Sequence, residues 1–328
     1  MMDEPRQTLI CSRSWTSADS ELAFVTRSLA GAASRHSEVV VVVPSPAGSI
    51  TPDGAFDLAG AGWSGPGEWP AAGHAVRPAQ LRGAPTVIVD EADAATLRLA
   101  KELAPGRAVA AVAGRPAAPG VRPLRFSGAP EGKPAEVIGV HIPVNPLAAQ
   151  HRFNGLGFTG YLLVLSDRAG APEPRPPTEM AAWLTARFPA ADVVVIENGS
   201  AAVWRGRALR GEVNVDTRTD LWRLLAHAKM TIDLAPGEIV ARECVESLRF
   251  GTPIVVPSVS AACPHADAGG GMSYRGFSDL LRAVETLGDD EMRAGAARRG
   301  RIYADARYGD PVAFVDQVAR QLGLAPAL

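Results

Sequence analysis

The sequence predicts an α/β protein with two doubly wound, Rossmann-like domains. Strand-like and helix-like segments alternate along most of the 328 residues, and this alternation is typical of parallel sheets covered by helices. A chain of this length can hold two ordinary domains, and 47% hydrophobic residues are ample for their cores. A fresh series of strands and helices begins with the apolar run 161–165, so we place the domain boundary near residue 155.

The N-terminal half opens with a βαβ unit. Residues 8–11 and 39–43 are short apolar runs and are expected to be strands. Residues 20–33 between them carry apolar residues at spacings of three and four, as at Leu22 and Val25, and are expected to form a helix. The same reasoning predicts strands at residues 86–89, 108–112 and 137–142 and a helix at residues 92–103.

One stretch of this half shows no period. Residues 45–82 are rich in Gly, Pro and Ala and include Trp63 and Trp69. Turn-forming residues at this density interrupt helices and strands, so this stretch is expected to be irregular. A second stretch, residues 115–134, is rich in proline and separates the strand at 108–112 from the strand at 137–142. The two tryptophans are expected to cover local core, with stacking on a sugar as the alternative.

The C-terminal half repeats the alternation. The expected strands are residues 161–165, 192–196, 230–234 and 254–256, and the expected helices are residues 178–188, 218–228, 239–250, 277–287, 302–307 and 311–322. The helix at 239–250 ends at Gly251-Thr-Pro253, because Gly and Pro both interrupt a helix. These elements predict a second doubly wound sheet.

Glu238 and Glu246 stand eight positions apart in the most informative part of this half. Residues 233–237 carry Pro and Gly and form a loop ahead of the helix, so both glutamates are expected on one helical face, about 12 Å apart along its axis. That separation is too long for a catalytic pair and suits the two ends of an extended polar ligand. Glu238 would lie beside the backbone N–H groups of the helix N-terminus, which favour a phosphate.

Around these glutamates the chain resembles the retaining, paired-glutamate glycosyltransferases of the GT-B fold (glycosyltransferase group 1 type). In that family the motif is followed by a Gly-x-Pro turn, a hydrophobic strand and a glycine-rich stretch, which match Gly251-Thr-Pro253, residues 254–256 and Gly269-Gly-Gly271. The resemblance covers roughly residues 156–310. Two glutamates alone are a weak signal, and the surrounding loop, turn and strand make it specific.

The resemblance implies two Rossmann-like domains that face each other across a cleft. Residues 1–155 would form the acceptor-side domain, residues 156–305 the domain that binds a nucleotide sugar, and residues 306–328 a C-terminal helix that crosses back to the first domain. Ligands of open parallel sheets bind at the carboxyl ends of the strands, which would line such a cleft.

The resemblance also implies roles for the residues of the motif. Glu246 would accept hydrogen bonds from the ribose hydroxyls of the nucleotide, and Glu238 would bind a hydroxyl of the donor sugar. The N–H groups of Ile239, Val240 and Ala241 would face the diphosphate or the sugar. Most members of this group need no bound metal, so none is expected here.

The chain departs from the family pattern at several positions. Arg168 ends the first strand of the domain and would neutralise the leaving diphosphate, but Glu173 stands where a Lys is usual, so Arg175 is the substitute cation. Residues 239–241 replace the usual glycines, which makes close backbone approach to a ligand harder. In the first domain, Asp90-Glu91 follows the strand where a His is common, so the chemistry on the acceptor side stays open.

Plainer explanations stand beside each of these roles. Both glutamates could be solvated helix residues, and Arg168 could be a surface ion-pair partner of a neighbouring aspartate. His141 and Cys244 are expected to pack within their elements. His265 has no second metal ligand at useful spacing.

Composition excludes several classes of function. Thirty-three Lys and Arg against 35 Asp and Glu give a net charge of −2, so nucleic-acid binding is not expected. The three cysteines are widely spaced, and they indicate neither a disulfide framework nor a metal site. The N-terminus is acidic, and no apolar run reaches the roughly 18 residues of a membrane span. We therefore expect a cytoplasmic protein, with peripheral membrane contact as an open alternative.

The sequence thus favours a retaining, hexosyl-type glycosyltransferase that uses a nucleoside diphosphate sugar as donor and no other cofactor. The acceptor, whether a sugar, a lipid-linked sugar or a small molecule, is not indicated. The main alternative is a catalytically inactive GT-B-like protein that binds a nucleotide or a partner, because a fold alone does not establish activity. An epimerase or phosphorylase of the same architecture is a more distant alternative.

Overall fold

The computed structural model describes residues 7–12, 20–44, 58–64, 86–91, 94–107, 109–113, 121–124, 126, 137–153, 156, 158–166, 177–197, 200–205, 208–234 and 239–324. The chain forms two compact units. Unit 1 comprises Met1–Phe126, Glu131–His141 and Pro311–Leu328, and unit 2 comprises Ser127–Pro130 and Ile142–Asp310. Apart from the short segment Ser127–Pro130, the chain passes between the units at His141–Ile142 and at Asp310–Pro311. The sequence placed these two divisions near residue 155 and at residue 306.

Unit 1 contains one largely parallel sheet. Its strands are β1 (Gln7–Cys11), β2 (Glu38–Pro44), β3 (Leu58–Ser64), β4 (Thr86–Glu91), β5 (Val109–Ala113) and β6 (Val121–Pro123). They are ordered β3-β2-β1-β4-β5-β6, and only the β2–β3 pair is antiparallel. Ile10 of β1 stands opposite Val41 of β2 and Ile88 of β4. The order of the strands reverses between β1 and β4, which is where doubly wound sheets bind ligands.

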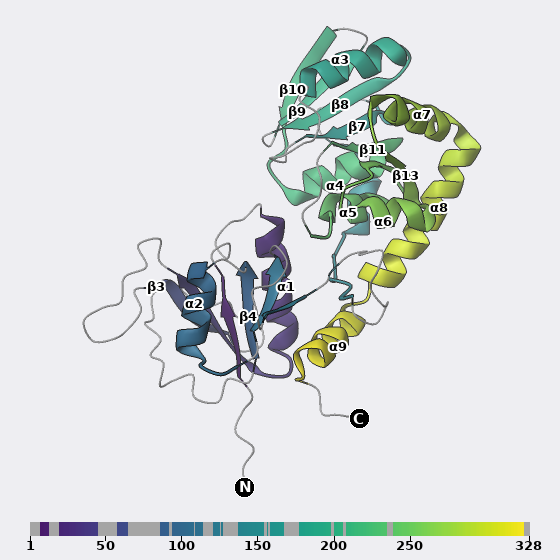
Figure 1. Ribbon diagram of the computed structural model, residues 1–328. Helices are drawn as coiled ribbons and strands as arrows, with labels where there is room; N and C mark the ends of the chain where they lie inside the picture. Colours follow the sequence, from purple (N-terminus) through teal and green to yellow (C-terminus); the bar gives the residue numbers. More distant parts are fainter. Residues whose placement is uncertain are drawn as a thin grey trace. The chain divides into compact units, whose positions relative to one another are not determined.

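Helices cover both faces of this sheet. They are α1 (Glu21–Ala33), α2 (Ala94–Leu103) and α9 (Pro311–Leu322). Leu9 and Val87 point to the face that α2 covers, so the intervening strand residues point to the opposite face, beside α1. Figure 1 shows α9 next to α1, and the Thr86 hydroxyl donates a hydrogen bond of 3.0 Å to the Leu322 carbonyl. The last helix is therefore part of the first unit.

Unit 2 contains a seven-stranded sheet. Its strands are β7 (Leu162–Leu165), β8 (Asp192–Glu197), β9 (Ser200–Arg205), β10 (Ala208–Asn214), β11 (Met230–Asp233), β12 (Ile254–Pro257) and β13 (Gly271–Tyr274). They are ordered β10-β9-β8-β7-β11-β12-β13. The strands β8, β7, β11, β12 and β13 are parallel to one another, and β9 and β10 add an antiparallel hairpin beside β8 at one edge.

The helices of unit 2 cover both faces of its sheet (Figure 1). They are α3 (Pro177–Arg187), α4 (Arg218–His227), α5 (Arg242–Phe250), α6 (Cys263–His265), α7 (Phe277–Gly288) and α8 (Asp290–Tyr308), with the 3-10 helix η3 (Pro146–Gln150) and the π-helical turn η4 (Ala266–Gly270). Leu162 and Val164 of β7 pack with α3 and α7, whereas Leu163 and Leu165 pack with α4. This alternation follows from the period of two in a strand. No described helix has the length and apolar character needed to cross a membrane.

The predicted fold class is confirmed, because both sheets are mainly parallel and carry helices on their two faces. The expectation that residues 45–82 are irregular was wrong, because they include β3. The strand β6, the hairpin β9–β10 and the full length of α8 were not predicted. β3 consists mostly of small residues, and β10 is largely exposed and includes the charged residues Arg210 and Glu212. Neither strand therefore carries the apolar pattern by which a strand is recognised.

Residues 137–142 do not form the expected last strand of the first sheet. Val137 makes a single bridge, and the residues after it have no strand partner among the described residues. Their backbone bonds go elsewhere: Gly139 N–H donates to the Gln317 side chain at 2.8 Å, and Ile142 N–H donates to the Tyr308 carbonyl at 3.0 Å. The apolar side chains of Ile138 and Ile142 are nevertheless buried, which explains the strand-like pattern.

Candidate functional site

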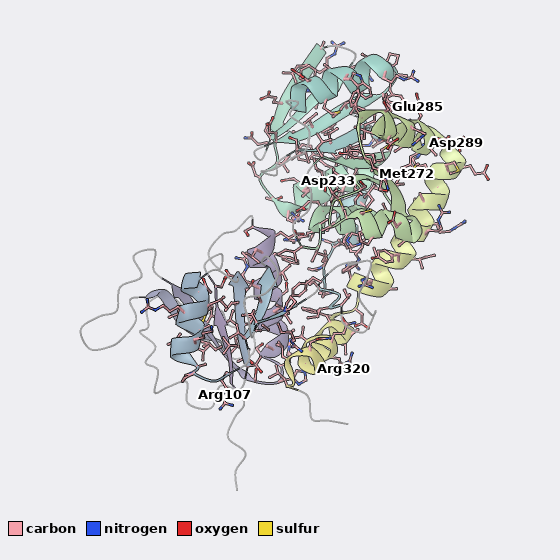
Figure 2. All side chains as sticks on the ribbon, viewed as in Figure 1. Arg107, Asp233, Met272, Glu285, Asp289 and Arg320 are labelled. Atoms are coloured by element: carbon pink, nitrogen blue, oxygen red, sulfur yellow. The ribbon has the colours of Figure 1, made fainter. Side chains whose placement is uncertain are left out.

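The candidate site lies where β11 leads into α5. β11 ends at Asp233, which is fully buried and is labelled in Figure 2. The Asp233 carboxylate accepts from the Cys244 thiol at 3.4 Å, and the Asp233 carbonyl accepts from the Tyr274 hydroxyl at 3.1 Å. The first contact docks the first turn of α5 against the carboxyl end of β11, and the second joins the end of β13 to the same strand end. Cys244 is buried, as its expected packing role requires.

Three of the predicted site residues, Glu238, Arg168 and Arg175, lie outside the described residues. The expectation that they bind the donor sugar and the leaving diphosphate therefore stays a prediction. Trp69 also lies outside, whereas Trp63 is part of β3. His141 is half-buried and is the last residue of unit 1 before the chain enters unit 2 at Ile142.

The helix that carries Glu246 begins later than predicted. α5 starts at Arg242, so Ile239, Val240 and Ala241 precede the helix rather than form its first turn. Ala241 caps it in the left-handed conformation, with φ 53° and ψ 61°, and is the only described residue other than glycine with a positive φ. Its carbonyl accepts from the N–H groups of Cys244 and Val245 at 2.9 and 3.2 Å.

This start changes the geometry of the motif. A left-handed residue breaks the helical path, so the separation of about 12 Å expected for two glutamates on one helix does not apply. Ile239, Val240 and Ala241 are all buried, so their side chains pack against the core around α5. A glycine would adopt a positive φ freely, whereas the alanine at position 241 adopts it at an energetic cost.

Glu246 is the predicted site residue that the structure describes most fully. Its side chain is 0% exposed, and its carboxylate accepts three hydrogen bonds from two arginines. Arg218 donates through Nε to Oε1 at 3.1 Å and through Nη2 to Oε2 at 2.5 Å. Arg242 donates through Nε to Oε1 at 3.0 Å. The buried carboxylate is thus balanced by two cations.

The network extends to the surface through Glu243. Arg218 donates through Nη1 to the Glu243 carboxylate at 2.8 Å, so one guanidinium bridges two glutamates of α5. A carboxylate offers about four acceptor positions, and three are used at Glu246. Oε2 therefore retains capacity for one further donor, provided that one of the covering arginines moves aside.

Arg218 is the functional candidate that sequence reasoning missed. It is the first residue of α4, directly after the capping residue Thr217, whose hydroxyl accepts from Asp220 N–H at 3.2 Å. It lies 28 positions before Glu246 in the sequence, and the contact between α4 and α5 brings the two together. No local pattern marks Arg218, because the pairing arises only in the folded sheet.

His265 was set aside in the sequence because it has no metal-ligand partners. It is fully buried, its Nε2 lies 2.9 Å from the Val240 carbonyl, and its Nδ1 lies 3.0 Å from the Tyr303 hydroxyl. Burial above all lowers the pKa of His265 to about 4; the hydrogen bond to the Val240 carbonyl opposes this shift, and the positive charge of Arg307 adds to it. The imidazole is therefore neutral near pH 7. Among the described residues, no three His, Cys, Asp or Glu side chains are grouped so that they could hold a metal ion.

Unit 1 carries one buried polar pair at its switch point. The Ser12 hydroxyl, directly after β1, donates to the Asp90 carboxylate of β4 at 2.8 Å, and both residues are fully buried. Burial and the charge of Asp90 raise the pKa of the neighbouring Cys11 thiol to about 12, so this thiol stays protonated. Asp90 thus lies near the carboxyl end of β4 as a buried acceptor rather than an exposed side chain.

No protein-family model matches the sequence, and no curated protein matches it either. Solved structures are similar along almost the whole chain. A glycosyltransferase involved in avilamycin A biosynthesis, AviGT4, aligns over 98% of this chain and 99% of its own, with 18% identity and a TM-score of 0.52. WaaG, a glycosyltransferase involved in lipopolysaccharide biosynthesis, covers 95% of this chain and 99% of its own, with 16% identity and a TM-score of 0.52.

A third similar structure is HepE from Anabaena in complex with UDP and glucose. It covers 98% of this chain and 100% of its own, with 13% identity and a TM-score of 0.59. Identities this low carry information on the fold alone. The chain therefore has the two-domain α/β fold that these glycosyltransferase structures share.

Proposed function

We propose that this protein is a glycosyltransferase that takes a sugar from a nucleoside diphosphate donor and transfers it with retention of the anomeric configuration. The observation that carries the proposal is Glu246, a buried carboxylate on the helix that follows β11, in the paired-glutamate motif of the sequence. The fold, shared over almost the full chain with glycosyltransferases, supports it. One of these was crystallised with UDP and glucose, so UDP is the first nucleotide to test.

In this proposal the ribose hydroxyls of the donor bind to Glu246. The carboxylate already carries three donors, so a hydroxyl would take the free position on Oε2 or replace Arg242 on Oε1. The displaced guanidinium would then be close to a helix N-terminus, where an anionic diphosphate is favoured. Arg242 would thus supplement Arg168 and Arg175, and Glu238 would bind a sugar hydroxyl.

The reaction itself needs no protein nucleophile. The bond between the anomeric carbon and the diphosphate oxygen breaks, and the acceptor hydroxyl forms a new bond to that carbon on the same face. The hydroxyl proton passes to the departing diphosphate, whose charge the arginines and backbone N–H groups stabilise. No metal ion or other cofactor enters these steps.

A second candidate function has a specific observation in its favour. The Glu246 carboxylate is covered by Arg218 and Arg242 and is 0% exposed, as expected of an ion-pair network that joins two helices. With that role, the chain would keep the scaffold of a glycosyltransferase and serve as a binding or partner protein. The two candidates differ in whether a nucleotide binds at all and whether a sugar is then released.

Calorimetric titration with UDP, GDP and ADP in parallel tests the proposal first. Micromolar binding of one nucleotide supports a donor site and identifies the base. Incubation with the corresponding nucleotide sugars, followed by NMR, then separates the two candidates. Release of a sugar that first appears with the anomeric configuration of the donor supports a retaining transferase. Nucleotide binding without any turnover supports a nucleotide-binding protein. The absence of binding contradicts the transferase and leaves a scaffold that serves a partner.

A further inference from the structure

His265 is a fully buried polar side chain that has no part in the proposed chemistry. It ends α6, and its ring centroid lies 5.8 Å from that of Tyr303 and 5.4 Å from that of Tyr308. Burying an imidazole is costly unless both ring nitrogens have partners. In this protein both do, and the partners belong to two different parts of unit 2.

The two hydrogen bonds of His265 have defined directions. The Val240 carbonyl can only accept, so Nε2 carries the proton and donates to it at 2.9 Å. Nδ1 is then an acceptor, and the Tyr303 hydroxyl donates to it at 3.0 Å. The imidazole therefore links α8, which carries Tyr303, to the backbone that leads into α5.

The hydrogen bond from His265 acts on the backbone next to a strained residue. Val240 directly precedes Ala241, the residue that adopts the left-handed conformation and turns the chain into α5. A residue in a sparsely populated backbone conformation keeps it only when its surroundings hold it there. The hydrogen bond from His265 fixes the peptide group immediately before that residue, two positions after Glu238.

The support behind His265 is tightly packed. A Cβ at Gly300 of α8 would lie 2.8 Å from the Cα of Gly270 and 2.7 Å from a methyl of Leu248, so α8 approaches the turn after His265 as closely as glycine allows. Tyr303 lies three residues beyond Gly300 on the same helix. The close contact between Gly300 and Gly270 fixes the position of α8, and with it the Tyr303 hydroxyl that donates to Nδ1.

We infer that His265 is a positioning residue of the proposed donor site. Through Val240, it holds the segment Ile239–Ala241 in the conformation that places the start of α5, and with it Glu246, for the donor. The inference rests on the proposed function. His265 itself touches no substrate, and it acts only through the backbone that it binds.

Two substitutions at His265 separate this role from general packing. His265→Gln places an amide N–H close to the position of Nε2 and keeps the donor to Val240, whereas the shorter His265→Asn does not reach the carbonyl. We expect hydrogen–deuterium exchange of peptides covering residues 239–245 to rise clearly in His265→Asn and to stay near the wild-type rate in His265→Gln. Equal exchange in His265→Asn and the wild type would overturn the inference.

A third variant keeps the test independent of whether His265→Asn folds well. Tyr303→Phe removes the hydrogen bond to Nδ1 and leaves the bond to Val240 intact. We expect it to raise exchange at the same peptides, to a smaller extent than His265→Asn. Unchanged exchange in Tyr303→Phe, together with an increase in His265→Gln equal to that in His265→Asn, contradicts the positioning role.

Titration with UDP then connects the segment to the donor site. His265→Asn is expected to bind UDP about five- to tenfold more weakly than the wild type, and His265→Gln within about twofold of it, as for the loss and retention of one hydrogen bond. Faster exchange at residues 239–245 with unchanged UDP affinity overturns the donor-site role. If the wild type binds no nucleotide, the proposed function has failed, and the exchange data still show whether His265 holds the segment.

Discussion

Arg218 and Glu246 form a two-point ion pair that joins the first turn of α4 to the buried face of α5. Nε and Nη2 of the arginine each donate to a different carboxylate oxygen, at 3.1 and 2.5 Å. The glutamate side chain is 0% exposed and that of the arginine 30%. A paired geometry of this kind is stronger and more directional than a single contact. It holds the proposed ribose-binding carboxylate in one orientation.

Arg218→Met is expected to lower the free energy of unfolding by about 2 kcal/mol. The substitution leaves the buried Glu246 carboxylate with Arg242 alone, and breaking a buried pair from one side costs about 3–5 kcal/mol. The partial exposure of Arg218 reduces that value by solvent screening. Urea unfolding measures it. Arg282→Met is the control, because its pair with Asp279 is exposed, and a change below about 0.5 kcal/mol is expected. Equal losses in both variants would contradict the assignment.

Gly271→Ala is expected to destabilise the protein by about 3 kcal/mol or prevent folding. A Cβ at Gly271 would lie 1.8 Å from the carbonyl oxygen of Ile254, its register partner on β12. Backbone atoms of a paired strand cannot move aside, so the clash is not relieved cheaply. Gly288→Ala is the matched control, because a Cβ at that helical position meets nothing within 4 Å. Thermal unfolding should show a neutral or slightly stabilised Gly288→Ala protein, and a mild Gly271→Ala variant would mean that β12 and β13 are paired differently.

Ala241→Val and Ala241→Gly should differ in stability by about 2 kcal/mol. Ala241 has φ 53° and ψ 61°, a region that glycine enters freely and a β-branched residue strongly resists. We expect Ala241→Gly to stay within about 1 kcal/mol of the wild type, because relief of strain offsets the loss of one buried methyl group. Denaturant midpoints of the two variants decide the matter. Equal stability of Ala241→Val and Ala241→Gly would contradict the left-handed conformation of Ala241 at the start of α5.

The protein should lose stability at acidic pH in part because His265 is buried in its neutral form. Its pKa is lowered from 6.5 to about 4 in the folded protein, so the unfolded chain binds a proton more readily between these values. Stability is therefore complete above pH 6.5 and falls as the pH drops toward 4, by about 3 kcal/mol in total. His265→Gln has no such group and should lose less stability over that interval. Unfolding curves at pH 7 and pH 4.5 test this, and equal losses in the two proteins would argue against a buried neutral imidazole.

The sequence was most informative where apolar strands are buried on both faces. β7, β8, β11 and β12 were all predicted, because parallel strands covered by helices read as continuous apolar runs. The edge strands β3 and β10 were not predicted. An edge strand forms because it pairs with the neighbouring strand, and its own residues need not be apolar. The start of α5 was misplaced because Ile239 and Val240 suit a helix locally, and only their surroundings impose the turn at Ala241.

The candidate site divides in the same way. Glu246 was found because a local motif surrounds it, and Cys244 because a small residue inside a helix usually packs. The partners that define their environment come from elsewhere in the chain: Arg218 from the start of α4, and His265 and Tyr303 from beyond β12. Such contacts depend on the order of the strands in the sheet, and that order cannot be read from a local sequence pattern.

Titration of UDP into two glutamate variants tests the central claim most directly. Glu246→Gln and Glu243→Gln each change one carboxylate that binds Arg218, on the same helix. If Glu246 binds the ribose, Glu246→Gln should lose at least about tenfold in UDP affinity, as for a lost charged hydrogen bond, while Glu243→Gln stays within about threefold of the wild type. Wild-type affinity in Glu246→Gln, or equal losses in both variants, would contradict the account and leave Glu246 as part of an ion-pair network that only joins α4 to α5.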